Sequence, residues 1–161
     1  MSSEIGFQLR PIGRVQEADG FFVIQIDEAI RPAMKLMDGF SHVHVLWWAD
    51  QLDTDEGRSV LQADLPYAPG TVAGVFASRS PARPNPIGLT TCFVLDVEHE
   101  AGTIAVAWID ADDGTPVLDI KPYIPLSDRA REVSVAVWLE SWPEWMEDAA
   151  KFDFAAHSLD E

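Results

Sequence analysis

Basic residues are scarce in this chain. It has 11 lysines and arginines against 27 aspartates and glutamates, which gives a formal net charge of −16. Because contacts with phosphate dominate affinity for nucleic acid, this charge argues against broad electrostatic binding to DNA or RNA. Binding of an RNA such as tRNA would need a small local patch of positive charge or the help of a dimer partner.

Cysteine is nearly absent, and long apolar runs are missing. The single cysteine, Cys92, excludes an intrachain disulfide and is interpreted as a small buried core residue rather than a nucleophile. No apolar run reaches the roughly 20 residues that a membrane helix needs. The first residues show no basic region followed by an apolar core, as a secretory signal would. A cytoplasmic protein that does not bind a membrane is the simplest interpretation.

Hydrophobic residues make up 47% of the 161 positions, enough for a substantial core. The sequence predicts one domain over residues 1–161, with a core from about 8 to 140 and a C-terminal helix and acidic tail over 141–161. Six tryptophans are present, and four of them lie in expected strands and are interpreted as core residues: Trp47, Trp48, Trp108 and Trp138.

Segments of strand length, rich in β-branched and aromatic residues, recur with turn signals between them. A brief helix is expected within 28–38, a long loop over 51–70, and a helix from 142 to about 151 behind an S-x-x-E capping pattern. The chain shows no alternation of strand and helix, which favours a mainly β fold, an antiparallel barrel or sandwich with one or two short helices. The expected strands are 20–26, 43–49, 71–78, 87–98, 103–109, 117–120 and 133–138.

A proline-rich loop over residues 78–86 is the most distinctive stretch. It lies in a window, 65–95, that contains no acidic residue and only two charges, Arg79 and Arg83. Arg83 and Asn85 each precede a proline, so their backbones are held extended. Such a stiff cationic loop fits a site for a ligand carboxylate or phosphate. A structural loop whose arginines pair with acids elsewhere explains the pattern equally well.

Motifs of the common cofactor sites are absent. No glycine-rich dinucleotide fingerprint and no P-loop occurs, so a Rossmann or P-loop site is unsupported. His42 and His44 are two residues apart, so both side chains face the same side of a strand. They could begin a metal site, but no third ligand is evident, and core or surface histidines explain them better. We therefore predict no metal.

The loop sequence Ser78-Arg-Ser-Pro-Ala-Arg-Pro-Asn-Pro-Ile-Gly-Leu89 resembles a signature of the TsaA-like (TrmO) family. Members of this family are S-adenosylmethionine-dependent methyltransferases, and the characterised ones act on N6 of threonylcarbamoyladenosine at position 37 of tRNA. Three further stretches agree with the family in order and spacing: 11–15 (P-I-G-R-V), 39–43 (G-F-S-H-V) and 113–125 (D-G-T-P-V-L-D-I-K-P-Y-I-P).

The resemblance implies a small β-barrel rather than a Rossmann methyltransferase, and a homodimer with S-adenosylmethionine near the subunit interface. It also implies site residues, matched motif to motif. The cofactor-binding residues would be Arg79, Leu89, Asp113, Gly114, Thr115, Asp50 and Gln51. The substrate-binding residues would be Arg83 and Asn85, and the catalytic ones Asp119, Lys121 and Tyr123.

Each charged part of S-adenosylmethionine has candidate partners. Arg79 or Arg83 could hold its carboxylate, and Asp113 or Asp50 its ammonium group or a ribose hydroxyl. Positioning of the acceptor atom can supply a large share of the barrier to methyl transfer, so a general base is optional. We expect the two proline-containing segments, 78–86 and 121–125, to fold against each other around the cofactor.

Two other functions remain open at this point. The stretch that follows the first motif runs almost directly from Val15 to the next strand, without the longer insert of the tRNA-modifying members. Together with the acidic charge, this leaves a small metabolite or another RNA as a possible methyl acceptor. A protein that binds S-adenosylmethionine without turnover is the third alternative.

Overall fold

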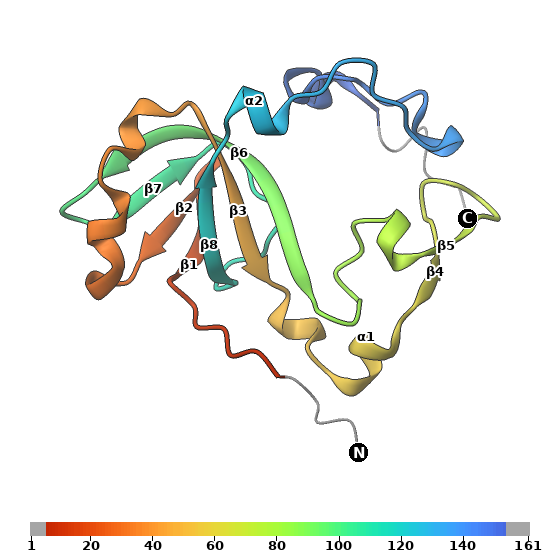
Figure 1. The fold of residues 1–161 in the computed structure, drawn as a ribbon, viewed down its shortest axis with the longest axis horizontal. Helices are drawn as coiled ribbons and strands as arrows, with labels where there is room; N and C mark the ends of the chain where they lie inside the picture. Colours follow the sequence, from red (N-terminus) through yellow and green to blue (C-terminus); the bar gives the residue numbers. More distant parts are fainter. Residues whose placement is uncertain (1–5, 154–161) are drawn as a thin grey trace.

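Six antiparallel strands close into a barrel in the computed structural model, which describes residues 6–153 (Figure 1). The order around the barrel is β1-β2-β7-β6-β3-β8, and β8 returns to β1. The mainly β, antiparallel barrel expected from the sequence is therefore confirmed, although β1 had not been recognised as a strand. The strands are β1 Gly13–Ala18, β2 Phe21–Ile26, β3 His42–Trp48, β6 Ile87–Glu98, β7 Thr103–Val106 and β8 Pro116–Pro122.

β-branched residues fill the barrel. Val15, Ile24, Val45, Ile104 and Val117 are fully buried, and each comes from a different strand. Such residues suit strands because their stiff side chains pack well on a pleated surface.

Cys92 lies in the same core at 1% exposure, and burial raises the pKa of its thiol to about 12. The interpretation of Cys92 as a core residue is confirmed. Trp108, in contrast, is 57% exposed, so its assignment to the core was wrong.

The burial of β3 differs from the expectation. Its nearly continuous apolar sequence predicted burial on both faces, but burial alternates strictly along the strand, with Val43, Val45 and Trp47 inside. The other face, which carries His42 and His44, is half-buried on the outside of the barrel. Other parts of the chain partly cover the outer face, so its side chains do not have to be polar, and the sequence of β3 can be apolar on both faces.

The segment between β3 and β6 leaves the barrel and is only partly a loop (Figure 1). The short helix α1 begins where the Thr54 hydroxyl accepts a hydrogen bond from the amide of Gly57 (3.0 Å). Residues 71–78 were expected to form a core strand, and this was wrong, because only 72–74 pair, and they pair with β4 in a separate two-stranded sheet. The elements here are η3 Asp50–Leu52, α1 Asp55–Ser59, β4 Gln62–Asp64, β5 Val72–Gly74 and η4 Val75–Ala77.

A C-terminal strap, residues 123–152, runs from the end of β8 across to the β4–β5 sheet (Figure 1). There, Trp138 packs on a small core formed by Leu65, Ala68 and Ala73, and Tyr67 meets the ring of Trp142 edge-on at 5.2 Å. Apolar alternation over 133–138 predicted a final strand, but no strand forms there, because this part of the chain packs on the β4–β5 sheet instead of pairing with the barrel. The strap elements are α2 Pro125–Asp128, η5 Val137–Leu139 and η6 Met146–Lys151.

The C-terminal helix was also placed too early and with the wrong geometry. Trp145, rather than Ser141, precedes the first turn, and the element is a 3-10 helix without a side-chain cap. The acidic tail after residue 153 lies outside the described residues. No helix among residues 6–153 is long and apolar enough to cross a membrane.

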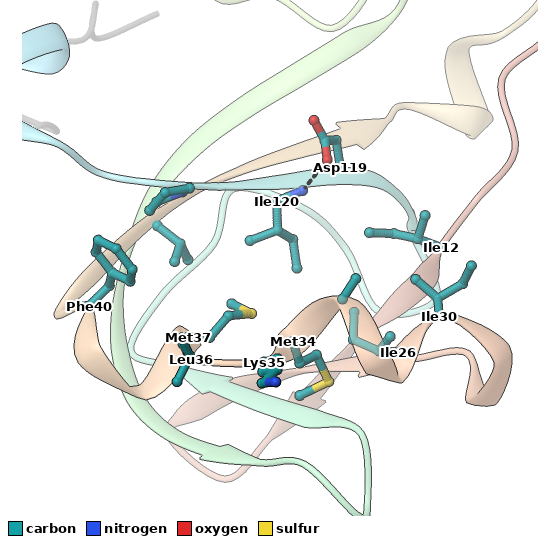
Figure 2. Close-up of a pocket in the computed structure, with 13 residues that line it drawn as sticks. Ile12, Ile26, Ile30, Met34, Lys35, Leu36, Met37, Phe40, Asp119 and Ile120 are labelled. Atoms are coloured by element: carbon teal, nitrogen blue, oxygen red, sulfur yellow. Dashed lines mark hydrogen bonds between the residues drawn. The ribbon is translucent and has the colours of Figure 1, made fainter.

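Two 3-10 helices, η1 Glu28–Met34 and η2 Met37–Gly39, cover one side of the barrel, where a brief helix was expected. Between them and β8 lies an apolar cavity of about 380 Å³, lined by Met34, Met37 and Ile120, among others (Figure 2). The Asp119 carboxylate points away from this cavity, toward the outer face of the barrel (Figure 2). The cavity is therefore separate from the face that carries the predicted site residues.

Candidate active site

The outer face of β3 gathers several of the predicted site residues. In the barrel, β3 lies between β6 and β8, and residues paired across strands point to the same side. Leu46 is paired with Leu89 on β6 and with Asp119 on β8, and His44 is paired with Lys121. Tyr123 comes directly after the end of β8, and its ring lies 5.5 Å from the ring of His44. One cofactor candidate and all three catalytic candidates thus share one face: Leu89, Asp119, Lys121 and Tyr123.

Asp119 and Lys121 form an ion pair on this face. Lys121 Nζ lies 2.8 Å from Asp119 Oδ2, and this contact raises the pKa of the lysine. The other carboxylate oxygen accepts a hydrogen bond from the amide of Ile120 (2.9 Å). With both oxygens engaged, Asp119 is better suited to hold Lys121 in place than to accept a proton.

At the centre of the face, sequence reasoning missed a row of three side chains, in which His44 is hydrogen-bonded to Thr91 and lies within ion-pair distance of Asp128. His44 Nδ1 lies 3.0 Å from Thr91 Oγ1, and His44 Nε2 lies 3.3 Å from Asp128 Oδ1. In a neutral ring with its hydrogen on Nε2, facing the carboxylate, Nδ1 accepts the hydrogen of the Thr91 hydroxyl. The spacing of His42 and His44 was visible in the sequence, but nothing there connects His44 to Thr91 or to Asp128.

The same contacts argue against a metal site at the histidine pair. Both ring nitrogens of His44 have partners, and Nδ1 of His42 lies 2.8 Å from the hydroxyl of Ser41. Within residues 6–153, no group of three or more His, Cys, Asp or Glu side chains is arranged to hold a metal ion.

The proline loop is folded by its own arginine. The guanidinium of Arg83 donates to the carbonyls of Val75 (2.9 Å), Ser80 (3.2 Å) and Ser78 (3.4 Å). Arg79, in contrast, is exposed and donates only to the carbonyl of Leu89, at 3.3 Å. Among the described residues Arg79 forms no ion pair, so most of its donors can still bind a ligand. Of the two arginines, Arg79 is the better candidate for a bound carboxylate.

Arg58, which sequence reasoning also missed, fastens the proline loop to the end of β3. Its guanidinium stacks on the ring of Trp48 (5.4 Å) and donates to Asp53 Oδ1 (2.5 Å) and to the carbonyl of Pro84 (2.9 Å). It also reaches Asn85 Oδ1 at 3.5 Å, so the side chain of this predicted substrate-binding residue already has a partner within the fold.

The Arg58 contact should make stability sensitive to acid. Hydrogen bonds from Arg58 and then Trp48 lower the pKa of Asp53 below its ordinary value of 3.8. A lowered folded-state pKa contributes stability that is present above pH 3.8 and lost as the pH falls through the folded value. We therefore expect Asp53→Asn to flatten the fall in stability below pH 4. Urea unfolding between pH 2.5 and 5 measures this, with Asp64→Asn as the control for one lost charge. Equal slopes for wild type and Asp53→Asn would contradict it.

The acidic turn over 110–115 lies against the start of the barrel. Asp113 Oδ1 accepts from the amide of Glu17 (2.9 Å), and the carbonyl of Gly114 accepts from Arg14 (2.9 Å). Gln51 donates to Asp112 Oδ2 (3.2 Å), so this turn and the segment after β3 are brought together. Gly114 has φ +83°, a conformation that favours glycine. Four cofactor candidates therefore lie in or beside this turn: Gln51, Asp113, Gly114 and Thr115, of which Thr115 is buried.

Asp50 begins η3 next to Gln51 and is exposed. In total, the candidates fall into two groups within one chain. One group lies at the Trp48 end of β3, where Ile87 follows the proline loop. The other lies toward the Val43 end, where Pro122 pairs. The two proline-containing segments, expected to touch, are thus separated by five residues of β3, roughly 17 Å.

Comparisons with known proteins agree with the motifs. The family of the tRNA-methyltransferase O N-terminal domain matches residues 10–129. An S-adenosyl-L-methionine-binding protein from Archaeoglobus fulgidus is 38% identical over 111 residues, which cover 69% of this chain and 75% of that protein. The mouse tRNA (adenine(37)-N6)-methyltransferase is 40% identical over 99 residues, which cover 62% of this chain and 22% of the mouse protein.

Solved structures give the same result for the fold. TrmO from P. aeruginosa superposes with a TM-score of 0.65 at 26% identity, over 85% of this chain. This chain covers 63% of that TrmO chain and therefore spans less than two thirds of its length.

Proposed function

Because this chain belongs to the family of the tRNA-methyltransferase O N-terminal domain, we infer that it is an S-adenosylmethionine-dependent methyltransferase. We propose that its acceptor is N6 of threonylcarbamoyladenosine at position 37 of tRNA. The observation that carries the proposal is the match over residues 10–129 together with the gathering of the motif residues on and around β3. A cytoplasmic location follows from a tRNA acceptor and is part of the same proposal.

The residues present fit S-adenosylmethionine. Arg79 has free donors for its carboxylate, and the exposed Asp50, whose carboxylate has no partner among residues 6–153, is available for its ammonium group. Leu89, 42% exposed, supplies apolar surface beside Arg79. When bound, the sulfonium supplies an electrophilic methyl group, which an acceptor nitrogen takes while the electrons of the S–CH3 bond stay on sulfur. The protein then has mainly to hold the acceptor in line and to manage its proton.

A homodimer is part of the proposal, and the exposed apolar side chains support it. Phe76 is 86% exposed beside the proline loop, Leu126 is 95% exposed in α2, and Val137 is 73% exposed in the strap. Burial of these three side chains against a second chain would remove their apolar surface from water. A pairing that brought the Val43 end of one β3 close to the Trp48 end of the other would complete a site that one chain leaves divided.

The charge distribution limits where tRNA can bind. Since the whole chain carries −16, contact with phosphate must be local, and the acid-free window around Arg79 and Arg83 is the candidate patch. Arg58, which contacts Pro84, adds a third guanidinium at its edge.

The test is a methylation assay with purified protein, S-adenosylmethionine and tRNA from a strain that lacks the modification. We expect S-adenosylhomocysteine in equal amount to the N6-methylated nucleoside, measured by mass spectrometry of the digested tRNA. Release of S-adenosylhomocysteine with a metabolite fraction and not with tRNA would show that the acceptor is a metabolite rather than tRNA. Binding of S-adenosylmethionine without release of S-adenosylhomocysteine by any fraction would leave a binding protein, which is how the Archaeoglobus relative is named.

A further inference from the structure

The chain Thr91–His44–Asp128 has the composition of a proton relay. It joins a hydroxyl, an imidazole and a carboxylate over two contacts of 3.0 and 3.3 Å. In hydrolases the same three kinds of group move a proton off a hydroxyl, with the carboxylate holding the imidazole in one tautomer. Here the order is reversed at the ring, since Nδ1 faces the hydroxyl and Nε2 faces the carboxylate.

The surroundings hold the three groups in place. The His44 and Asp128 side chains are only 18% and 23% exposed. Asp128 is itself fixed, because its Oδ2 accepts from the amide of Ile124 at 2.7 Å, at the start of α2. The ring of Tyr123 lies against His44, and Lys121 is paired with Asp119 rather than with Asp128. The positions of the ring, the hydroxyl and the carboxylate are therefore fixed by β3, β6 and α2, respectively, and not by a loose surface contact.

The relay also lies where the reaction would take place. On β6, Thr91 is two residues beyond Leu89, so both side chains face the same side, and Arg79 donates to the carbonyl of Leu89. The hydroxyl of Thr91 thus neighbours the residue pair that we assign to S-adenosylmethionine.

The proposed acceptor makes a relay useful. N6 of the carbamoylated adenosine is bonded to the purine ring and to a carbonyl carbon, so its lone pair is delocalised and it is a weak nucleophile. Removal of its hydrogen during attack leaves the two electrons of the N–H bond on nitrogen, where they can form the new bond. A positioned proton acceptor typically contributes 10²- to 10⁴-fold to such a step.

We propose that Thr91, His44 and Asp128 receive the N6 proton during methyl transfer, an inference that rests on the function proposed above. The electrons of the N6–H bond remain on nitrogen and form the bond to the methyl carbon. The proton passes to Thr91 Oγ1 as the hydroxyl gives its own proton to His44 Nδ1. The resulting imidazolium lies beside the Asp128 carboxylate. Thr91 is the catalytic residue in this scheme, and His44 and Asp128 are positioning residues.

The deciding comparison is between Thr91→Val, which keeps the shape and removes the hydroxyl, and Thr91→Ser, which keeps the hydroxyl. We expect Thr91→Val to lower kcat for tRNA methylation about 100-fold, and Thr91→Ser to stay within about fivefold of wild type. The affinity for S-adenosylmethionine should change less than twofold in both. His99→Gln, which removes a histidine paired with Asp38 at the far hairpin, is the control and should retain wild-type kcat.

A second readout needs no substrate. Nitrogen-15 spectra of the imidazole rings at neutral pH should show His44 with its hydrogen on Nε2, and Thr91→Val should shift the Nδ1 resonance alone. Asp128→Asn, which keeps the size of the side chain, should disturb the tautomer without unfolding the barrel. A hydrogen on Nδ1 of His44 in the wild type would overturn the relay.

The two proposals fail in different ways. A wild type that methylates tRNA, with Thr91→Val equally active, overturns the relay and leaves the function standing. A wild type that releases no S-adenosylhomocysteine with any tRNA overturns the function, and the catalytic role of Thr91 with it, whatever tautomer His44 shows.

Discussion

Replacing Arg79 with alanine should weaken binding of S-adenosylmethionine by about 1.5–3 kcal/mol, roughly 10- to 150-fold in Kd. The reason is that hydrogen bonds to a charged group are worth more than neutral ones, and Arg79 is the arginine of the proline loop with donors to spare. Its one side-chain hydrogen bond among residues 6–153, to the carbonyl of Leu89, is long and exposed, so the variant should fold normally. Calorimetric titration gives the affinity, and thermal unfolding without ligand checks the fold.

Two variants separate charge from geometry at this position. Arg79→Lys keeps the charge but loses the planar fork, so its affinity should fall between those of wild type and alanine. Lys35→Ala removes one positive charge beside the apolar cavity, away from the outer face, and should bind as wild type does. If Arg79→Ala bound with wild-type affinity, Arg79 would be structural, and Arg83 would become the carboxylate candidate.

Gly88→Ala should lower the free energy of unfolding by about 1–3 kcal/mol or more. Gly88 is paired with Trp47 across β6 and β3, and a Cβ added to it would overlap the indole ring. The ring has no room to move, because it is 8% exposed and its Nε1 donates to the buried hydroxyl of Thr90 at 3.1 Å. Overpacking a fixed core site forces either an unfavourable rotamer or a backbone shift.

Gly74→Ala is the matched control for this prediction. Its added Cβ would meet only the carbonyl of Leu61, at 3.8 Å, and its φ of −65° suits any residue. Urea unfolding should therefore leave its midpoint near that of the wild type, while that of Gly88→Ala falls. Equal midpoints for the two variants would show that Trp47 can repack. Gly88 comes just after the proline loop. If Gly88→Ala lost ligand binding and Gly74→Ala did not, the site would depend on the register of β6.

The fold could be predicted from the sequence where local pattern and tertiary position agree. β2 and β6 were placed well because β-branched runs between turn signals specify strands by themselves. Residues 71–78 and 133–138 carry the same pattern, yet neither joins the barrel. Only Ala73 and Trp138 pack in the small second core around Leu65, and most of the other apolar side chains of these segments are exposed. Nothing local distinguishes a strand that closes a barrel from an apolar segment that packs beside it.

The candidate site could be predicted only as far as motifs reach. The proline loop and the segment 113–125 named residues that do gather around β3, because strand register fixes which of them share a face. Thr91, Asp128 and Arg58 were missed because each acts through a partner distant in sequence: His44 is 47 positions before Thr91, and Pro84 is 26 positions after Arg58. Such contacts are set by the closure of the barrel and by where α2 and α1 come to rest.

The shortest seam of the barrel has a thermodynamic consequence. β1 and β8 are joined by only two residue pairs, Gly13 with Val117 and Arg14 with Pro116. The turn that carries Asp113 and Gly114 lies at this seam and is tied to β1 through Arg14 and Glu17. A ligand that binds this turn only while the turn lies against β1 favours the closed seam over an opened one, and it stabilises the protein by an amount set by its concentration relative to its Kd. Ligand occupancy and closure of the barrel between its first and last strands are therefore one linked equilibrium.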